Sequence, residues 1–187
     1  MRARNLTEPR IEFVFGQVND QLKGELKAFW KQHGKAYQEE LRSFRLASSS
    51  HAGQHFDPLK KPLLRQPAAV SRDQSGVVNG IMFVVLRELD DSLGLGSHAY
   101  FQRMYIVSKS RHYGLSNRLF REFLQGFDRE AERRDHRAKV LFSENINPGL
   151  QKASMRRYFS RLGFQMLGGN RLGGEVWSKE LETRFCF

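Results

Sequence analysis

The chain has 187 residues, of which 40% are hydrophobic, and it carries a formal net charge of +11 at pH 7. This length is typical of one domain that buries its own core, and fifteen phenylalanines exclude a disordered chain. The single cysteine, Cys186, has no partner for an internal disulfide, which favours a cytoplasmic protein. No apolar segment follows the basic residues 1–4, so neither a secretory signal nor a membrane span is expected.

The first quarter of the chain predicts one strand and two helices. Residues 10–16 alternate between apolar and polar side chains, as a strand does. Asn19 or Asp20 can cap a helix whose apolar positions lie within residues 22–30. A second, shorter helix is expected over residues 37–44.

A long irregular loop and a β-hairpin are expected next. Residues 47–67 contain serines, two histidines and three prolines without a regular apolar period, so they are predicted to form a loop. Residues 68–72 and 77–86 read as two strands that flank residues 73–76, Asp-Gln-Ser-Gly, a sequence typical of a tight turn.

The following segment predicts a strand, a cationic glycine loop and a helix. A strand-like run at residues 100–107 leads into the loop at residues 108–116. The helix after it places these apolar residues on one face: Leu115, Leu119, Phe120, Phe123, Leu124 and Phe127. Free N–H groups at its first turn, the helix dipole and Arg111 would form an anion site suited to phosphate. Gly114 and Ser116 are small enough for a ligand to approach the backbone.

The last third of the chain predicts a strand, a helix and a second hairpin. Residues 138–142 are typical of a buried strand, and residues 150–162 form a helix that Gly163 ends. Residues 164–167 and 175–181 then form the hairpin. Neither G-x-x-x-x-G-K-[ST] nor G-x-G-x-x-G follows a strand, which excludes two common phosphate-binding loops.

Two motifs resemble those of the GNAT superfamily of acyl-CoA-dependent N-acetyltransferases. Residues 111–116, Arg-His-Tyr-Gly-Leu-Ser, resemble its R/Q-x-x-G-x-G/A signature, and residues 158–164 resemble its Y-x-x-L-G-F-type motif. The order of predicted elements is similar to the family's along nearly the whole chain. The resemblance implies one α/β (α+β) domain over residues 1–187. Its central mixed, mostly antiparallel sheet would splay between the fourth and fifth strands, with about four helices around it.

The resemblance also implies which residues hold acetyl-CoA as co-substrate. The main chain of Met104, Tyr105 and Ile106 would pair with the pantetheine arm like an added strand. Five residues would surround the pyrophosphate: Arg111, His112, Gly114, Leu115 and Ser116. Asn145, at the mouth between the two central strands, could hydrogen-bond a cofactor amide. Its alternative role is that of a turn or cap residue beside Asn147.

Acyl transfer to an amine needs a group that takes the amine's proton and a group that protonates the leaving thiolate. In much of the family the acid is a tyrosine four residues before the helix-ending glycine, a position that Phe159 holds here. Tyr158, one residue earlier, is the candidate acid, and its alternative role is packing. Gln102 stands near the family's usual glutamate, so the candidate bases are Glu88 and Glu144, each with the alternative of a solvated carboxylate.

The sequence thus predicts an N-acetyltransferase that moves an acetyl group from acetyl-CoA to a primary amine of a small molecule or peptide. The alternative is a catalytically weak or inactive GNAT-like module that binds nucleic acid or senses acyl-CoA. The absence of the family's usual acid and base residues favours this alternative, whereas the intact anion loop favours the enzyme. The excess of positive charge attracts polyanions, so weak contact with nucleic acid or an acidic protein is expected, and the sequence leaves an oligomer open.

No metal site is predicted. His51 and His55 lie four residues apart with Asp57 nearby, a spacing that would bring the two imidazoles together on a helix. Gly53 and the surrounding serines disfavour a helix there, and no H-E-x-x-H motif is present. The loop is predicted instead to contact the acceptor, because the resembling family covers its acceptor side with this region.

Overall fold

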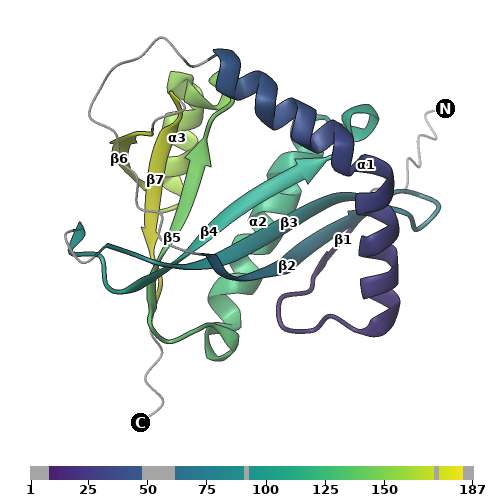
Figure 1. Cartoon of the computed structure of the whole chain (residues 1–187), viewed down its shortest axis with the longest axis horizontal. Coiled ribbons are helices and arrows are strands. Elements are labelled where there is room, and N and C mark those ends of the chain that lie inside the picture. The colour runs from purple at the N-terminus through teal and green to yellow at the C-terminus, as the bar shows by residue number, and fades with distance from the viewer. Residues whose placement is uncertain (1–8, 48–61, 91–92, 171–172, 183–187) are drawn as a thin grey trace, which may run out of the picture.

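The computed structural model describes residues 9–47, 62–90, 93–170 and 173–182, in which seven strands form one mixed sheet (Figure 1). The strands are β1 (Arg10–Phe13), β2 (Pro62–Arg72), β3 (Val78–Glu88), β4 (His98–Ile106), β5 (Ala138–Asn145), β6 (Gln165–Gly169) and β7 (Glu175–Glu180). The α-helices in these ranges are α1 (Asp20–Ala47), α2 (Tyr113–Arg129) and α3 (Ala153–Arg161). Short 3-10 helices lie in the connections: η2 (Ser108–Ser110), η3 (Ala131–Arg133) and η4 (Pro148–Gln151).

The sheet separates between two of its central strands. Its order is β1-β2-β3-β4-β5-β7-β6, and β4 and β5 are its parallel pair, with antiparallel neighbours on both sides. The pairing of β4 with β5 ends at Gln102 and Ser143, although β4 continues to Ile106 and β5 to Asn145. The predicted sheet, mostly antiparallel and splayed between its fourth and fifth strands, is therefore confirmed.

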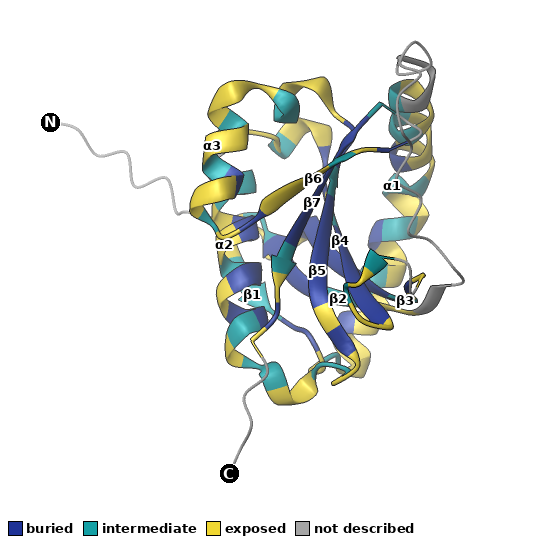
Figure 2. Ribbon diagram, turned by 90° about the vertical axis from the view of Figure 1, so that its left-hand side faces the viewer, coloured by how far each residue is buried: buried dark blue, intermediate teal, exposed yellow. Residues whose placement is uncertain are grey.

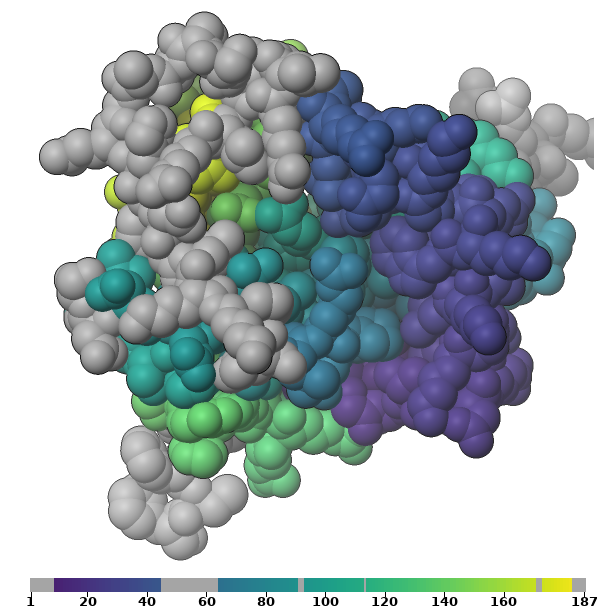
Figure 3. Space-filling model, viewed as in Figure 1, coloured from purple at the N-terminus to yellow at the C-terminus, as the bar shows by residue number. Residues whose placement is uncertain are grey.

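Helices cover both faces of the sheet. Figure 2 shows α1 on one side and α2 and α3 on the other. In the space-filling view α1 lies beside the teal strands on the face turned to the viewer (Figure 3). All six apolar residues predicted on one face of α2 are buried in the core between α2 and the sheet: Leu115, Leu119, Phe120, Phe123, Leu124 and Phe127. The amphipathic period in the sequence thus identified this core correctly.

The two helices predicted between residues 22 and 44 are a single helix, so the described chain has three α-helices rather than about four. Its apolar face continues in phase, with Leu22, Phe29 and Tyr37 buried in one cluster. Gly34 lies between the two predicted helices, and a Cβ there would meet nothing within 4 Å. A glycine at such a position weakens a helix by about 1 kcal/mol and need not end it. Figure 1 shows that α1 changes direction along its length.

The predicted loop at residues 47–67 was too long at its carboxyl end, because residues 62–67 belong to β2. Prolines break a regular strand pattern because they lack an N–H donor. In β2 the register with β3 shifts between Pro62 and Leu64 and again between Pro67 and Ala69. Bulges of this kind let a strand accept prolines without losing its pairing further on.

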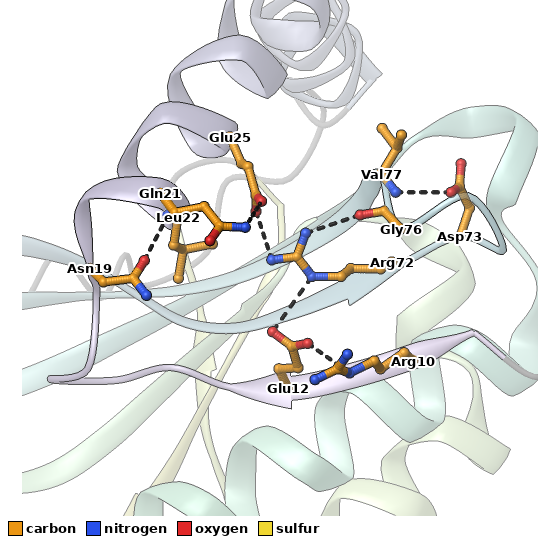
Figure 4. Close-up of polar contacts among 10 residues, drawn as sticks. All are labelled: Arg10, Glu12, Asn19, Gln21, Leu22, Glu25, Arg72, Asp73, Gly76 and Val77. Carbon is orange, nitrogen blue, oxygen red and sulfur yellow. Dashed lines mark hydrogen bonds and ion pairs between the residues drawn. The ribbon is translucent and has the colours of Figure 1, made fainter.

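Arg72 ties the first strand, the first helix and the β2–β3 hairpin together (Figure 4). Its guanidinium donates to Glu25 at 2.6 Å, to Glu12 at 3.5 Å and to the Gly76 carbonyl at 3.0 Å. The hydrogen bond from Arg72 lowers the pKa of Glu25. Asn19 caps α1 by accepting the Leu22 N–H at 2.8 Å, as one of the two predicted caps.

Asp135 organises the turn that leads into β5. Its carboxylate accepts from the Arg137 main chain at 3.0 Å and from the Arg137 guanidinium at 2.9 and 2.6 Å. Its own N–H donates to the Tyr100 hydroxyl. The hydrogen bonds from Arg137 lower the pKa of Asp135 to about 2, from an ordinary value of 3.8.

We therefore expect Asp135→Asn to destabilise the fold at pH 7, by about 1 kcal/mol or less, as for other partly exposed ion pairs. A lowered pKa in the folded state stabilises the fold above pH 3.8, and that stabilisation is lost as the pH falls from 3.8 to about 2. Urea unfolding of both proteins at pH 7 and at pH 3 measures the effect. The difference between them should be smaller at pH 3, and a difference that stays constant would contradict the assignment.

None of the helices in the described part of the chain combines the length and the apolar run that a membrane span requires.

Candidate functional site

A pocket of about 540 Å³ opens where β4 and β5 separate. Its walls come from α1, the ends of β4 and β5, the start of α2, η4 and α3. Of the residues predicted for the site, these line it: Met104, Tyr105, Ile106, Arg111, His112, Ser116, Glu144, Asn145 and Tyr158. Residues from six elements of the fold therefore meet at the splay.

α2 begins beside the pocket, and His112 has a role there that the sequence did not predict. His112 is the N-cap of α2, and its Nδ1 accepts the Leu115 N–H at 3.1 Å. The Leu115 side chain is buried in the core and its N–H is bonded within the cap, so Leu115 offers a ligand neither a side chain nor a free donor. A Cβ at Gly114 would lie 3.3 Å from His112 Nδ1, tighter than most such contacts. Glycine at this position therefore leaves room for the imidazole of His112 and lets a ligand come close to the backbone.

Arg111 is fixed between β4 and α1. Its Nε donates to the Ile106 carbonyl at 2.7 Å, and its guanidinium lies over the Tyr105 ring at 5.5 Å from the centroid. The two terminal nitrogens donate to the two carboxylate oxygens of Glu40 in α1, at 2.8 and 2.5 Å. The terminal nitrogens of Arg111 thus bind an anionic group in this structure, and that group is the carboxylate of Glu40.

Asn145 carries a buried donor that lacks a partner. A chain of hydrogen bonds leads to it: Gln102 Nε2 donates to Ser143 Oγ at 2.5 Å, and Ser143 Oγ donates to Asn145 Oδ1 at 3.3 Å. Asn145 is only 2% exposed, and its Nδ2 makes no hydrogen bond within the described residues. An unpaired buried donor costs about 1–3 kcal/mol, which a carbonyl oxygen of a ligand would offset. Asn145 is also one of the residues that line the pocket, so this unpaired amide belongs to the pocket wall.

An ion pair joins the two strands beyond their last paired residues. Arg103 of β4 donates to Glu144 of β5, whose side chain is only 8% exposed. Asn170 Nδ2 donates to the other oxygen of Glu144 at 3.4 Å. Glu144, a candidate base, therefore lies in the pocket wall with a cation beside it, and an amine would have to share this carboxylate with Arg103.

Tyr158 lies on α3 with its ring directed at α2. Its hydroxyl donates to Asn117 Oδ1 at 2.5 Å, and both residues line the pocket. Phe159, at the family's usual tyrosine position, stacks on Trp177 with ring centroids 5.5 Å apart and is buried. Of the two neighbouring rings, only that of Tyr158 can bring a hydroxyl to the pocket.

Comparisons with known proteins agree on the fold. Neither protein-family models nor curated proteins give a match. Among solved structures, the acetyltransferase of the GNAT family from Streptococcus pneumoniae has a TM-score of 0.53 and 14% identity, covering 93% of this chain and 100% of that one. The GNAT family N-acetyltransferase YhbS from Escherichia coli, in complex with CoA, has a TM-score of 0.51 and 14% identity, covering 97% and 86%. This chain has the GNAT fold.

One candidate base lies elsewhere in the GNAT fold. Glu88 ends β3 and is paired in register with His98, the first residue of β4. The pocket lies at the opposite end of β4, beyond Gln102. The structure therefore does not bring Glu88 to the residues that line the pocket, because β3 and β4 run antiparallel.

Several pocket residues of the GNAT fold were not anticipated from the sequence. Tyr37 and Glu40 come from α1, and Asn117 comes from the face of α2 predicted to point away from the core. Burial raises the pKa of Tyr37, so its hydroxyl stays protonated at neutral pH. Tyr37 and Leu41 lie on the apolar face of the helix predicted over residues 37–44, and no sequence signal distinguishes a core position from a pocket wall that continues it.

His51, His55 and Asp57 lie outside the described residues. Within the described ranges, no three His, Cys, Asp or Glu side chains are close enough to hold a metal ion together.

Proposed function

We propose that this chain is an acyl-CoA-dependent N-acyltransferase that moves an acetyl group from acetyl-CoA to a primary amine. One observation carries the proposal: β4 and β5 part at a pocket lined in part by Asn145, whose amide Nδ2 is buried and makes no hydrogen bond within the described residues. The start of α2, with its cap His112 and with Arg111, bounds the same pocket. An elongated ligand with amides in its middle and phosphates at one end matches this order of groups.

Different parts of the pocket would bind different parts of acetyl-CoA. The unpaired edge of β4 at Met104 and Tyr105 would hydrogen-bond the pantetheine arm, and Asn145 Nδ2 would donate to one of its carbonyl oxygens. The first turn of α2 would receive the pyrophosphate, because its N–H groups and dipole favour negative charge. The thioester that acetyl-CoA supplies provides the acyl carbon on which the amine nitrogen acts.

The chemistry needs two proton transfers. The amine nitrogen forms a bond to the acyl carbon, the carbon–sulfur bond breaks, the nitrogen loses a proton and the thiolate gains one. Two carboxylates of the described chain line the pocket, Glu40 and Glu144, and we assign to Glu144 the proton from nitrogen, taken directly or through water. Tyr158 can supply a proton to sulfur once its hydroxyl turns from Asn117.

We expect acetyl-CoA to raise the melting temperature of the protein. At a concentration ten times its Kd, a ligand that binds only the folded state adds about 1.4 kcal/mol to the free energy of unfolding. For a chain of this size that corresponds to about 3–6 °C. Differential scanning fluorimetry with acetyl-CoA measures the shift. A melting temperature that does not respond to millimolar acetyl-CoA would refute the proposal.

A second candidate function is a GNAT-fold module that binds acyl-CoA without turnover. Phe159 favours it, because a phenylalanine stands where the resembling family has its acid. Acetyl-CoA consumption over a broad panel of amines separates the two functions. Binding with transfer to an amine supports the enzyme, whereas binding without transfer to any of them supports the module.

A further inference from the structure

Glu40 occupies the place on Arg111 that a phosphate would take. The two Glu40 carboxylate oxygens accept from the two terminal nitrogens of the guanidinium, at 2.8 and 2.5 Å. Arginine grips carboxylates and phosphates with this same two-pronged geometry. The prongs are the edge of Arg111 that faces away from β4, because Nε is already bonded to the Ile106 carbonyl.

The pair is accessible to an exchange of partners. The Arg111 side chain is 39% exposed and the Glu40 side chain 26%, and both line the pocket. An ion pair at this exposure contributes at most about 1 kcal/mol, so an incoming phosphate with more negative charge can displace it. Arg111 itself would move little, because the Ile106 carbonyl and the Tyr105 ring hold it from behind.

We propose that Glu40 is an internal anion that competes with a phosphate of the acyl donor for Arg111. This inference rests on the proposed function. Glu40 then sets the affinity for the donor: binding requires the exchange of one anion for another on the same guanidinium, and the displaced carboxylate repels the phosphate that replaces it. A ligand that carries the pantetheine arm without phosphates would not enter this competition.

The test removes the charge of Glu40 and keeps its shape. Glu40→Gln should bind CoA roughly three- to tenfold more tightly than the wild type in isothermal titration calorimetry, the range expected when a partly exposed ion pair no longer has to be broken. Pantetheine, which lacks the phosphates, should bind both proteins equally. In an Arg111→Ala background, Glu40→Gln should give a clearly smaller gain, because no ion pair has to be broken there and only the repulsion of the phosphate is removed.

Glu39→Gln is the matched control. Glu39 is the neighbour of Glu40 on α1, is 60% exposed and pairs with Lys35 at 3.9 Å. Its substitution makes the same change in net charge away from the pocket lining, so its CoA affinity should equal that of the wild type. An equal gain in Glu39→Gln would attribute the effect to bulk charge and overturn the inference.

The outcomes separate the inference from the proposed function. If the wild type binds CoA and Glu40→Gln binds it equally or more weakly, Glu40 does not compete, and the inference fails while the proposed function stands. A gain for pantetheine as large as that for CoA would also overturn it, because no phosphate is then involved. If neither protein binds CoA, both the inference and the proposed function fail.

Discussion

Gly114→Asp is expected to lower the affinity for acetyl-CoA at least about a hundredfold and to abolish the ligand-induced rise in melting temperature. Gly114 is the second residue of α2, where a phosphate would approach the helix N-terminus. Two like charges about 4 Å apart repel by about 4 kcal/mol at an effective dielectric constant of 20. A hundredfold loss of affinity needs only about 2.7 kcal/mol. The new Cβ would also crowd the His112 imidazole at 3.3 Å.

The free protein should survive this change, which makes the loss of binding interpretable. An aspartate in the first turn of a helix interacts favourably with the helix dipole. Gly114→Ala is the control, since it adds the same Cβ without the charge and should keep most of the affinity. Calorimetric titration of both variants with acetyl-CoA, with their melting temperatures measured without ligand, decides the matter. If Gly114→Asp binds acetyl-CoA as tightly as the wild type does, the N-terminus of α2 is not part of the binding site.

The elements that the sequence predicted best are those whose core contacts repeat along one segment. The apolar positions of α2 recur every three or four residues, so a single face could be assigned before any partner was known. The turn of the β2–β3 hairpin was equally local, because Asp73 accepts from the Ser75 and Val77 main chain and Gly76 adopts a φ of +78°. Both features depend only on residues close together in the sequence, so they could be predicted without knowing the rest of the fold.

The errors arose where a local signal was overridden by packing or pairing. Gly34 interrupts helix propensity, yet α1 continues through it because residues on both sides pack on the same face of the sheet. Pro62 and Pro67 interrupt strand propensity, yet β2 continues because its register with β3 shifts around them. Glycine and proline therefore weaken an element without determining where it ends.

The ion pairs of the pocket were beyond sequence reasoning for another reason. Arg111 and Glu40 are 71 residues apart, and Arg103 and Glu144 are 41 apart. Any of the chain's 20 aspartates and glutamates could have been the partner of either arginine, and periodicity does not indicate which one is. The resemblance to a known family suggested a role for Arg111 but could not reveal that an internal carboxylate holds it.

Tyr158→Phe is expected to lower kcat by about a hundredfold or more while the Kd for acetyl-CoA stays the same. A general acid within reach of its proton acceptor contributes about 10²–10⁴ to a rate. Tyr158 is the tyrosine of α3 that lines the pocket, and its hydroxyl hydrogen is directed at Asn117 Oδ1 in this structure. A ring without the hydroxyl keeps the contacts with Phe120 and Phe159, so binding and folding should change little.

Asn117→Ala distinguishes an acid from a packing residue at position 158. It leaves the Tyr158 hydroxyl in place and removes the oxygen that holds it, so turnover should fall less than in Tyr158→Phe. The rate of acetyl transfer and the Kd for acetyl-CoA, measured for both variants, give the comparison. If Tyr158→Phe transfers acetyl groups at the wild-type rate, the tyrosine only packs between α2 and α3. The thiolate would then have to take its proton from water or from another hydroxyl of the pocket, such as that of Tyr37, since Phe159 offers none.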